Sequence, residues 1–559
     1  MTGVINEPMN EERSSFDLSA ALNLDLATIG DFYPISADTL EMRGKLNFDG
    51  KAAGRTADAE NATVNGTLTL RDGYIRYHEF PQPIEDIVFE SQIRGNTINI
   101  TGSSLRSGSN RLAITGSVTD YMADSPGMNL QLNGTADLAE INDFYSLEEY
   151  VNHIVGKAEM NLRVTGRTGD IENLSFNGSF NLRDGAISAD SLPQPITDLN
   201  TTLTFSDKNV QVTSFVMNMG ASDFSLSGTL SDYMALAAEN TTTPSTLTGT
   251  YRSRLLNIDE LYDWDAEAPD DEEYPIELPN LKSVMQAEID EMIMLGVSIT
   301  NVKGQIETDP NKVSFRNTVA DLFDGKISGE MAWNVPQPER TEVVFNGKME
   351  DVRIEAFFEE FSPIGKSTFH KYMSGGFNLE TTYRTWLDIH FDPEVATTKA
   401  AGTFLMKEGS MKNHPMQMRL ADLLKISELT DLGIDDIDAK YSIDNGSLTF
   451  EHFNLTSRDM GLQLDGTQNL LNDQINFRLS LILPGRFAEF LRPVITAQGV
   501  QAITREDGKM VLPVTATGTA ENPNIGVDTD KLEEVIKSKL SEEAGDRVRD
   551  ALRGILRRN

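Results

Sequence analysis

The stretch NGTLTLRDGYIRYHEFPQPI, from Asn65 to Ile84, returns as NGSFNLRDGAISADSLPQPI from Asn177 to Ile196. Corresponding positions are 112 residues apart, and no gap is needed to superimpose the two stretches. Neither stretch holds an obvious catalytic group. A duplicated stretch with glycine and proline at fixed places indicates a structural unit that the chain uses more than once.

The same spacing extends beyond the quoted stretch. Asp31–Tyr33 (DFY) returns at Asp143–Tyr145, and the later segment 402–411 again resembles the start of the unit. A period this long predicts several elements in each unit. We therefore expect a first β repeat over 1–128, a second over 129–240, a degenerate third over 241–345 with an acidic linker at 265–279, a C-terminal repeat over 346–527, and a C-terminal amphipathic helix over 528–559.

Within a unit, apolar and polar residues alternate with a period of two. This pattern is typical of antiparallel strands with one apolar face and one hydrated face. The RDG tripeptides at 71–73 and 183–185 predict tight turns that reverse the chain, with glycine at positive φ. The PQP tripeptides predict connections or edges, because proline cannot donate a ladder hydrogen bond.

Few segments favour helix. Leu138–Val155, Met416–Ser427 and Arg486–Val494 can each place apolar residues on one side. The tail from Asp528 has the strongest helical pattern, with acidic residues in its first turn and arginines near its end. The sequence thus predicts a mainly β fold: an elongated, repetitive antiparallel sheet that forms a curled groove, with a few short helices and a C-terminal amphipathic helix.

The composition excludes several classes of function. A formal net charge of −38 disfavours nucleic acid, because phosphate binding needs a basic surface. The chain has no cysteine, which removes disulfides and thiolate metal sites. We find neither a long uninterrupted apolar window nor a secretory signal at the start of this sequence.

No catalytic or metal-binding motif stands out. The six histidines lie far from one another in sequence, and neither HExxH nor GxSxG occurs. Asp72 and Asp184 each precede a glycine, which is a turn signature rather than an acid–base pair. The acidic run Asp270–Glu273 lacks the spacing of a calcium loop. We expect no enzymatic activity, no catalytic residue, no metal site and no cofactor.

A long sheet with one apolar face must cover that face, and acyl chains are one way to do so. Each buried methylene contributes about 0.8 kcal/mol, so a lipid with two long tails would gain on the order of 20 kcal/mol. The candidate lipid-contacting residues are the alternating apolar side chains of the first two units: Leu68, Leu70, Ile98, Ile100, Leu112, Ile114, Val210, Val212, Phe224, Leu226 and Leu230.

The order strand, DG, PQPI, strand and DFSLSGTLSDY at 223–233 resembles bacterial AsmA-like proteins, and so does LPVTATGTAENPNIGVD at 512–528. The resemblance covers nearly the whole chain and rests on structural motifs. It implies a repeating β-groove, as in TamB-like and bridge-like lipid-transfer proteins, phospholipid as partner, and envelope membrane proteins as further partners. It also implies a periplasmic location in a Gram-negative bacterium, a role in outer-membrane assembly, and an inner-membrane anchor in a segment absent from this sequence.

The same alternation has a second interpretation. It would equally fill the dry core of a β-sandwich or β-solenoid, in a structural or surface protein that binds partner proteins or glycans. Period alone does not separate a filled core from an open face. An exposed row of apolar side chains would favour lipid, and a closed interior would favour the second class.

Overall fold

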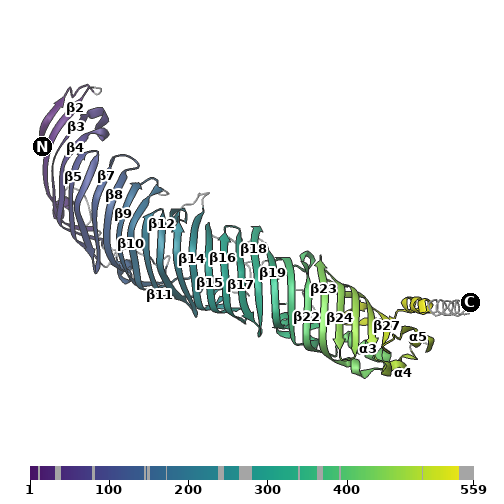
Figure 1. Cartoon of the computed structure of the whole chain (residues 1–559). Helices are drawn as coiled ribbons and strands as arrows, with labels where there is room; N and C mark the ends of the chain where they lie inside the picture. Colours follow the sequence, from purple (N-terminus) through teal and green to yellow (C-terminus); the bar gives the residue numbers. More distant parts are fainter. Residues whose placement is uncertain are drawn as a thin grey trace, which may run out of the picture. The chain divides into compact units, whose positions relative to one another are not determined.

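The computed structural model describes residues 1–10, 13–31, 40–77, 82–143, 147, 151–170, 173–236, 244–262, 280–337, 340–361, 369–388, 392–493, 495 and 497–539. The fold is mainly β, as the sequence predicts. The described residues form 28 strands, assigned to one mostly antiparallel sheet (Figure 1). The chain divides into two compact units: unit 1 holds β1 to β14 and most of β15, and unit 2 holds most of β16 and all of β17 to β28.

Unit 1 is a succession of hairpin-connected strands, each paired with its neighbours in the sequence. Two short 3₁₀ helices, η1 (Leu26–Asp31) and η3 (Leu138–Asp143), follow β2 and β8. The strands are β1 (Thr2–Asn6), β2 (Ser15–Asp25), β3 (Leu40–Arg55), β4 (Thr63–Tyr77), β5 (Ile84–Gly95), β6 (Thr97–Ser107), β7 (Asn110–Thr119), β8 (Gly127–Asp137), β9 (His153–Arg167), β10 (Ser175–Ser188), β11 (Ile196–Asp207), β12 (Asn209–Met219), β13 (Ser222–Ser231), β14 (Ser245–Asn257) and β15 (Leu281–Met294).

The duplication in the sequence is a duplication of six strands. The bounds of β2, β5 and β6, each shifted by 112 residues, are the bounds of β8, β11 and β12. The bounds of η1 give those of η3 in the same way. The register irregularities between β5 and β6 also recur between β11 and β12, at 85/88 and 197/200. Each unit of the repeat is therefore a six-stranded antiparallel meander, β2 to β7 and then β8 to β13.

The RDG tripeptides are bulges inside strands, so the prediction of tight turns was wrong. Asp72 lies within β4 and Asp184 within β10, and the register shifts on both sides of the glycine that follows. The aspartate, not the glycine, takes positive φ, at 54° and 52°. Aspartate tolerates a positive φ in bulges as well as in turns. The same Asp–Gly pair is therefore compatible with either structure.

Glycine is needed at these bulges for close approach. A Cβ on Gly156 of β9 would lie 3.0 Å from the Cα of Gly185 in β10. Likewise, a Cβ on Gly44 of β3 would lie 2.9 Å from the Cα of Gly73 in β4. The contact returns in unit 2, where a Cβ on Gly375 would meet the Cα of Gly409 at 3.0 Å. The repeated sequence thus encodes a glycine–glycine contact that lets a bulged strand pack against its neighbour.

Among the strand pairs that the structure describes, one parallel pair interrupts the antiparallel order. β14 pairs directly with β15 in parallel. In the second unit of the repeat, β8 and β10 run in the same direction because β9 lies between them. Asn301 in β16 has a positive φ, as Asp198 has in β11, so β16 corresponds to β11. The strand before each of them then corresponds as well, which pairs β15 with β10 in the repeat. The third copy of the repeat therefore has no strand between β14 and β15 that corresponds to β9. When one strand of a meander is omitted, the strands on either side of it become parallel neighbours.

Unit 2 adds a partial second layer of helices to its strands. Its helical segments are α2 (Ile354–Phe361), η6 (Phe369–Tyr372), η7 (Val395–Thr397), α3 (Pro415–Leu424), η8 (Ser427–Thr430), η9 (Gly485–Phe487), α4 (Ala488–Leu491) and α5 (Ala497–Ile503). Its strands are β16 (Val297–Asp309), β17 (Lys312–Leu322), β18 (Gly325–Gln337), β19 (Arg340–Arg353), β20 (Met373–Ser374), β21 (Gly376–Leu387), β22 (Lys399–Lys412), β23 (Asp431–Asp444), β24 (Ser447–Ser457), β25 (Met460–Asn469), β26 (Gln474–Leu483), β27 (Met510–Thr519) and β28 (Pro523–Val527).

The helix predictions have mixed outcomes. α3, and η9 with α4, confirm helical structure within 416–427 and 486–494. The helix predicted over Leu138–Val155 was wrong at its two ends, because Leu138–Asp143 forms the 3₁₀ helix η3 and β9 begins at His153. Residues 144–146 and 148–150 of that segment lie outside the described part. The tail is helical over 529–539, and residues 540–559 lie outside the described part. The acidic linker 265–279 also lies outside it, and Pro193 and Pro195 stand in a connection as expected.

We predict that Gly156→Ala destabilises the fold. Its φ is +140° and the added Cβ would press on the backbone of Gly185, so we expect a loss of about 1–3 kcal/mol. Urea unfolding followed by circular dichroism measures the loss as a lower midpoint. Gly102→Ala is the matched control, because the nearest atom to its Cβ is a side-chain oxygen at 3.9 Å. Equal midpoints for the two variants would contradict the close-approach role.

Candidate functional site

The strand register places all eleven predicted lipid-contacting residues on one face of unit 1. Residues directly opposite in neighbouring strands point to the same side of a sheet, as do residues two apart in one strand. Leu68 lies opposite Ser91, Ser91 opposite Ile100, and Ile100 opposite Gly116. This links the candidates of β4 and β6 to Ile114 and Leu112 on β7.

A continuous row then crosses to β14. Its members, one per strand from β7 to β14, are Ile114, Leu132, Leu162, Gly178, Phe205, Val210, Leu230 and Leu247. We call this side of β2 to β14 the apolar face. Besides the eleven candidates it includes Leu46, Phe48, Leu130, Leu132, Leu162, Val164, Phe180, Leu203 and Phe205.

The apolar face is only partly covered. Val210 and Val212 are buried, and the other nine candidates keep intermediate exposure. Among the described residues, the buried hydrophobic side chains begin at Val164, so β1 to β8 contribute none. A sheet face this rich in leucine and isoleucine ordinarily packs against a second layer. Here nine of the eleven candidate side chains keep intermediate exposure.

The opposite face of the same strands is polar, and several of its side chains pair with one another. Gln131 donates to the Asn161 side chain at 2.7 Å, and Thr229 donates to Gln211 at 2.8 Å. Arg71 and Glu90 form an exposed ion pair at 3.0 Å. The two faces of unit 1 therefore differ sharply in chemistry, one hydrated and one apolar.

Unit 2 shows what a covered apolar face looks like in this chain. Leu464 on β25 occupies the place of Leu226 on β13, because MGLQLDGT at 460–467 aligns with SDFSLSGT at 222–229. Leu464 is 8% exposed and its neighbour Leu479 is 3% exposed. They pack in one cluster with Leu420 and Leu424 of α3. The same strand pattern thus becomes a dry core where helices lie on it.

Sequence reasoning missed about half of the apolar face. Leu130 and Leu132 stand in NLQLN, and Leu203 and Phe205 stand in TLTF, both with the period-two signal that was available. Tyr251 on β14 was also missed. It lies opposite Leu226, and its ring is 6.2 Å from Phe224. Burial raises the pKa of Tyr251 to about 12, so its phenol stays uncharged on the apolar face.

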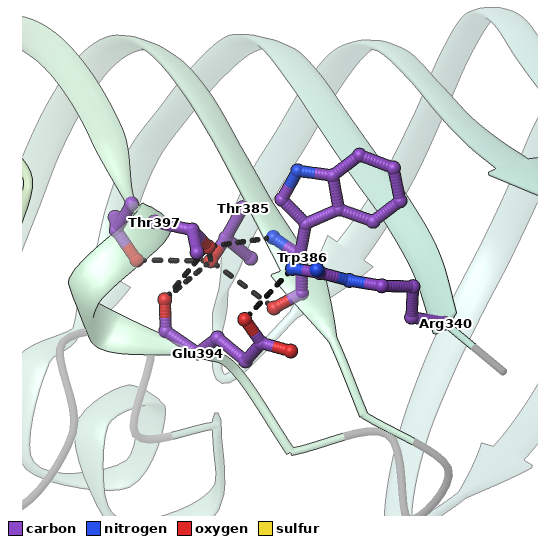
Figure 2. A network of polar contacts seen from close by, with 6 residues as sticks. Arg340, Thr385, Trp386, Glu394 and Thr397 are labelled. Atoms are coloured by element: carbon purple, nitrogen blue, oxygen red, sulfur yellow. Dashed lines mark hydrogen bonds and ion pairs between the residues drawn. The ribbon is translucent and has the colours of Figure 1, made fainter.

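A second cluster of polar side chains lies in unit 2, around Arg340 and Glu394 (Figure 2). An Arg340 Nη atom lies 2.8 Å from a Glu394 carboxylate oxygen, and the guanidinium stands 4.4 Å above the Trp386 ring. The Trp386 backbone N–H donates to the Thr397 hydroxyl at 3.1 Å, and buried Thr385 bonds to the Glu394 carbonyl. These contacts fasten the segment after β21 to the start of β19. The network is therefore structural.

Other kinds of site find no support in the described residues. No group of three or more histidine, aspartate or glutamate side chains there is placed to hold a metal ion. In the same part of the chain, none of the helices combines the length and the apolar character that a membrane crossing requires.

Comparisons with protein-family models, curated proteins and solved structures each give no match for this chain. The apolar face is therefore interpreted from its own geometry.

The helical cover of unit 2 makes a pH-dependent contribution to stability. His414 caps α3. Its side-chain Nδ1 accepts from the Met416 backbone N–H at 3.3 Å, and its backbone N–H donates to Oε1 of Gln417 at 2.9 Å. Burial lowers the pKa of His414 from 6.5 to about 4. The unfolded chain therefore binds this proton more readily, so the contribution is full above pH 6.5 and is lost as pH falls toward 4.

We predict that this loss is roughly 3 kcal/mol between pH 7 and pH 4, at about 1.36 kcal/mol per pKa unit. His414→Asn keeps a capping side chain without a titrating group, and it should remove this part of the pH dependence. The measurement is the unfolding free energy of both proteins at the two pH values. Identical losses in the two proteins would show that His414 does not titrate in this way.

Proposed function

We propose that the apolar face of unit 1 binds the acyl chains of phospholipids. The observation that carries this proposal is the coincidence of register and burial. All eleven candidate residues share one face, and none of the hydrophobic side chains described in β1 to β8 is buried. An apolar face whose side chains mostly keep intermediate exposure, on a protein with net charge −38, is typical of an interaction site rather than a packing defect.

The size of the face suits acyl chains. Neighbouring strands are about 4.8 Å apart, so the row from Ile114 to Leu247 spans about 34 Å. The chains of one bilayer leaflet need about half of the roughly 30 Å hydrocarbon thickness. Each methylene moved from water onto the face contributes about 0.8 kcal/mol. The headgroup needs no dedicated charged site, because it stays in water at the edge of the sheet.

We further propose that the strands curl around the lipid and make the apolar face a groove. Bulges recur at matching places in β4 and β10, and bulges bend strands and increase their twist. A curled sheet would bring side chains around an acyl chain from more than one direction and exclude more water than a flat one.

The wider role follows from the resemblance to AsmA-like proteins. On this proposal the protein is non-enzymatic and belongs to the envelope of a Gram-negative bacterium. It would carry phospholipid between the inner and outer membranes from the periplasm, anchored to the inner membrane by a segment absent from this sequence. Such a protein would contribute to outer-membrane assembly, with envelope proteins as partners at either end.

A structural or partner-binding protein is the second candidate function. The observation that favours it is the dry cluster of unit 2, where Phe477, Leu483 and Leu512 are at most 4% exposed beneath the helices. In that part of the sheet the helices already cover the described apolar side chains. The lipid proposal is therefore limited to strands whose apolar side chains lack such a cover.

We predict that the protein purified from bacterial cells carries phospholipid, measured by organic extraction and mass spectrometry. Replacing Leu226 and Leu230 together by aspartate should lower bound lipid by roughly tenfold or more. If only two acyl-chain methylenes lose their apolar contact, the binding free energy weakens by about 1.6 kcal/mol. A loss of about 1.4 kcal/mol already lowers the affinity tenfold. Both residues lie on β13 with intermediate exposure, so the strand itself should tolerate the change.

The matched control replaces Ser227 and Thr229 by aspartate on the same strand. These residues alternate with Leu226 and Leu230 and face the hydrated side. The control should keep its lipid, with unchanged circular dichroism in both variants. A wild-type protein that is folded and free of lipid, even after incubation with liposomes, would favour the structural alternative.

A further inference from the structure

Strand β14 carries polar side chains on the side of the apolar face. Tyr251 lies opposite Leu226, and Ser253 and Asn257 follow it at even spacing along the same strand. Residues two apart in a strand point to the same side of a sheet, so all three face the apolar side. The Tyr251 phenol oxygen, the Ser253 Oγ and the Asn257 Oδ1 are buried, and none of these atoms has a hydrogen-bond partner among the described residues.

The two hydroxyl groups lie close together but do not satisfy each other. Ser253 is 4% exposed. Burial raises the pKa of Tyr251, and the nearby Ser253 hydroxyl offsets part of this rise, but the two oxygens make no hydrogen bond of normal geometry. Buried hydroxyl groups are nearly always hydrogen-bonded in native proteins, so a pair in this state is a candidate to bind a polar group of a ligand.

The repeat shows that these hydroxyls are not required by the fold. Tyr251 corresponds to Leu132 of β8 and Leu479 of β26, because each lies opposite the equivalent residue of the preceding strand. Two residues further along, Ser253 stands where β26 has Leu481. Apolar side chains therefore suit both places in a strand of this kind, and β14 departs from the pattern by placing hydroxyls there.

We propose that Tyr251 and Ser253 bind the ester groups of an acyl lipid, with their hydroxyls donating hydrogen bonds to its carbonyl oxygens. We call these two residues the hydroxyl pair. The inference rests on the proposed function and adds a fixed point for the lipid on the apolar face. Tyr251 keeps intermediate exposure, and its ring centroid lies 6.2 Å from that of Phe224. An acyl chain that lies on these two rings has its ester next to the hydroxyl pair.

The surroundings favour an uncharged oxygen over an anion. Among the described residues of β13 to β15, no lysine or arginine faces the apolar side. The two arginines of β14, Arg252 and Arg254, alternate with the hydroxyl pair and lie on the hydrated side. Glu291 of β15 lies opposite Leu255 and adds negative charge to the apolar side. An ester carbonyl accepts hydrogen bonds without carrying a charge, so it suits the hydroxyl pair better than a phosphate or a carboxylate does.

The end of β14 suits the headgroup of the same lipid. Asn257 is the last residue of the strand, and about 13 Å of extended backbone separates it from Ser253. Its Nδ2 donates to Glu260 at 2.9 Å, which fixes the amide, and its Oδ1 is able to accept from a hydroxyl or ammonium group. The ester would thus stay on the apolar face while the charged part of the headgroup reaches water at the edge of the sheet.

The test compares diacyl phosphatidylcholine with its dialkyl ether analogue, which has the same headgroup but no carbonyl oxygens. The protein is incubated with vesicles that contain equal amounts of the two lipids and is then separated from them, and its bound lipid is quantified by mass spectrometry. Tyr251→Phe combined with Ser253→Ala removes both hydroxyls. Thr250→Val is the matched control, because the Thr250 hydroxyl lies on the hydrated side, 2.9 Å from that of Ser227.

We expect the wild type and Thr250→Val to retain the ester lipid about tenfold over the ether lipid, because the ether cannot accept the two hydrogen bonds. The double variant should retain both lipids equally, in an undiminished total amount and with unchanged circular dichroism. Equal retention by the wild type, or an ester preference that survives in the double variant, would overturn the role of the hydroxyl pair and leave the apolar face as a lipid site. A wild type that retains neither lipid would overturn the proposed function as well.

Discussion

The structure of this protein depends on one constraint, which is that a single-layer sheet with alternating side chains has an apolar face and must keep it from water. Unit 2 meets the constraint with its own chain, because α3 and the helices after β26 lie on the strands and bury Leu479, Leu483 and Val514. Unit 1 leaves most of the equivalent side chains at intermediate exposure, with Val164, Val210 and Val212 among the exceptions. The proposed lipid would take the place of the helical layer of unit 2, which has no counterpart in the described residues of unit 1.

The apolar face of unit 1 is built by repeating one structural unit. One six-stranded meander, with its 3₁₀ segment and its glycine–glycine contact, is used twice almost without change and then modified. Omitting a strand in the third unit yields the parallel pair of β14 and β15 without reversing the apolar face, since Tyr251 and Ala287 remain opposite each other. Changes of strand number therefore leave the division between apolar and hydrated sides intact.

Much of this was predictable from sequence because period-two alternation reports directly on strand faces. The pairs Leu68 and Leu70, or Leu226 and Leu230, needed no tertiary information. The errors arose where one local signal has two structural uses. An Asp–Gly pair occurs both in hairpin turns and in bulges, and a positive φ at aspartate is found in both. The sequence therefore predicted a turn at Asp72, where the structure has a bulge. The segment 138–155 has helical spacing, yet a strand that pairs with two neighbours begins at His153. The burial of Leu464 against α3 could not be predicted, because it depends on a helix more than 30 residues away in sequence.

The central claim is that acyl chains lie on the apolar face, and side-specific fluorescence quenching tests it most directly. Single cysteines at Ile114 and Thr115 stand next to each other on β7 but on opposite sides of the sheet. Each would carry an environment-sensitive fluorophore and be mixed with phospholipid brominated along its acyl chains. The account predicts strong quenching at position 114 and little at position 115. Equal quenching at the two positions, or none at either, would contradict it.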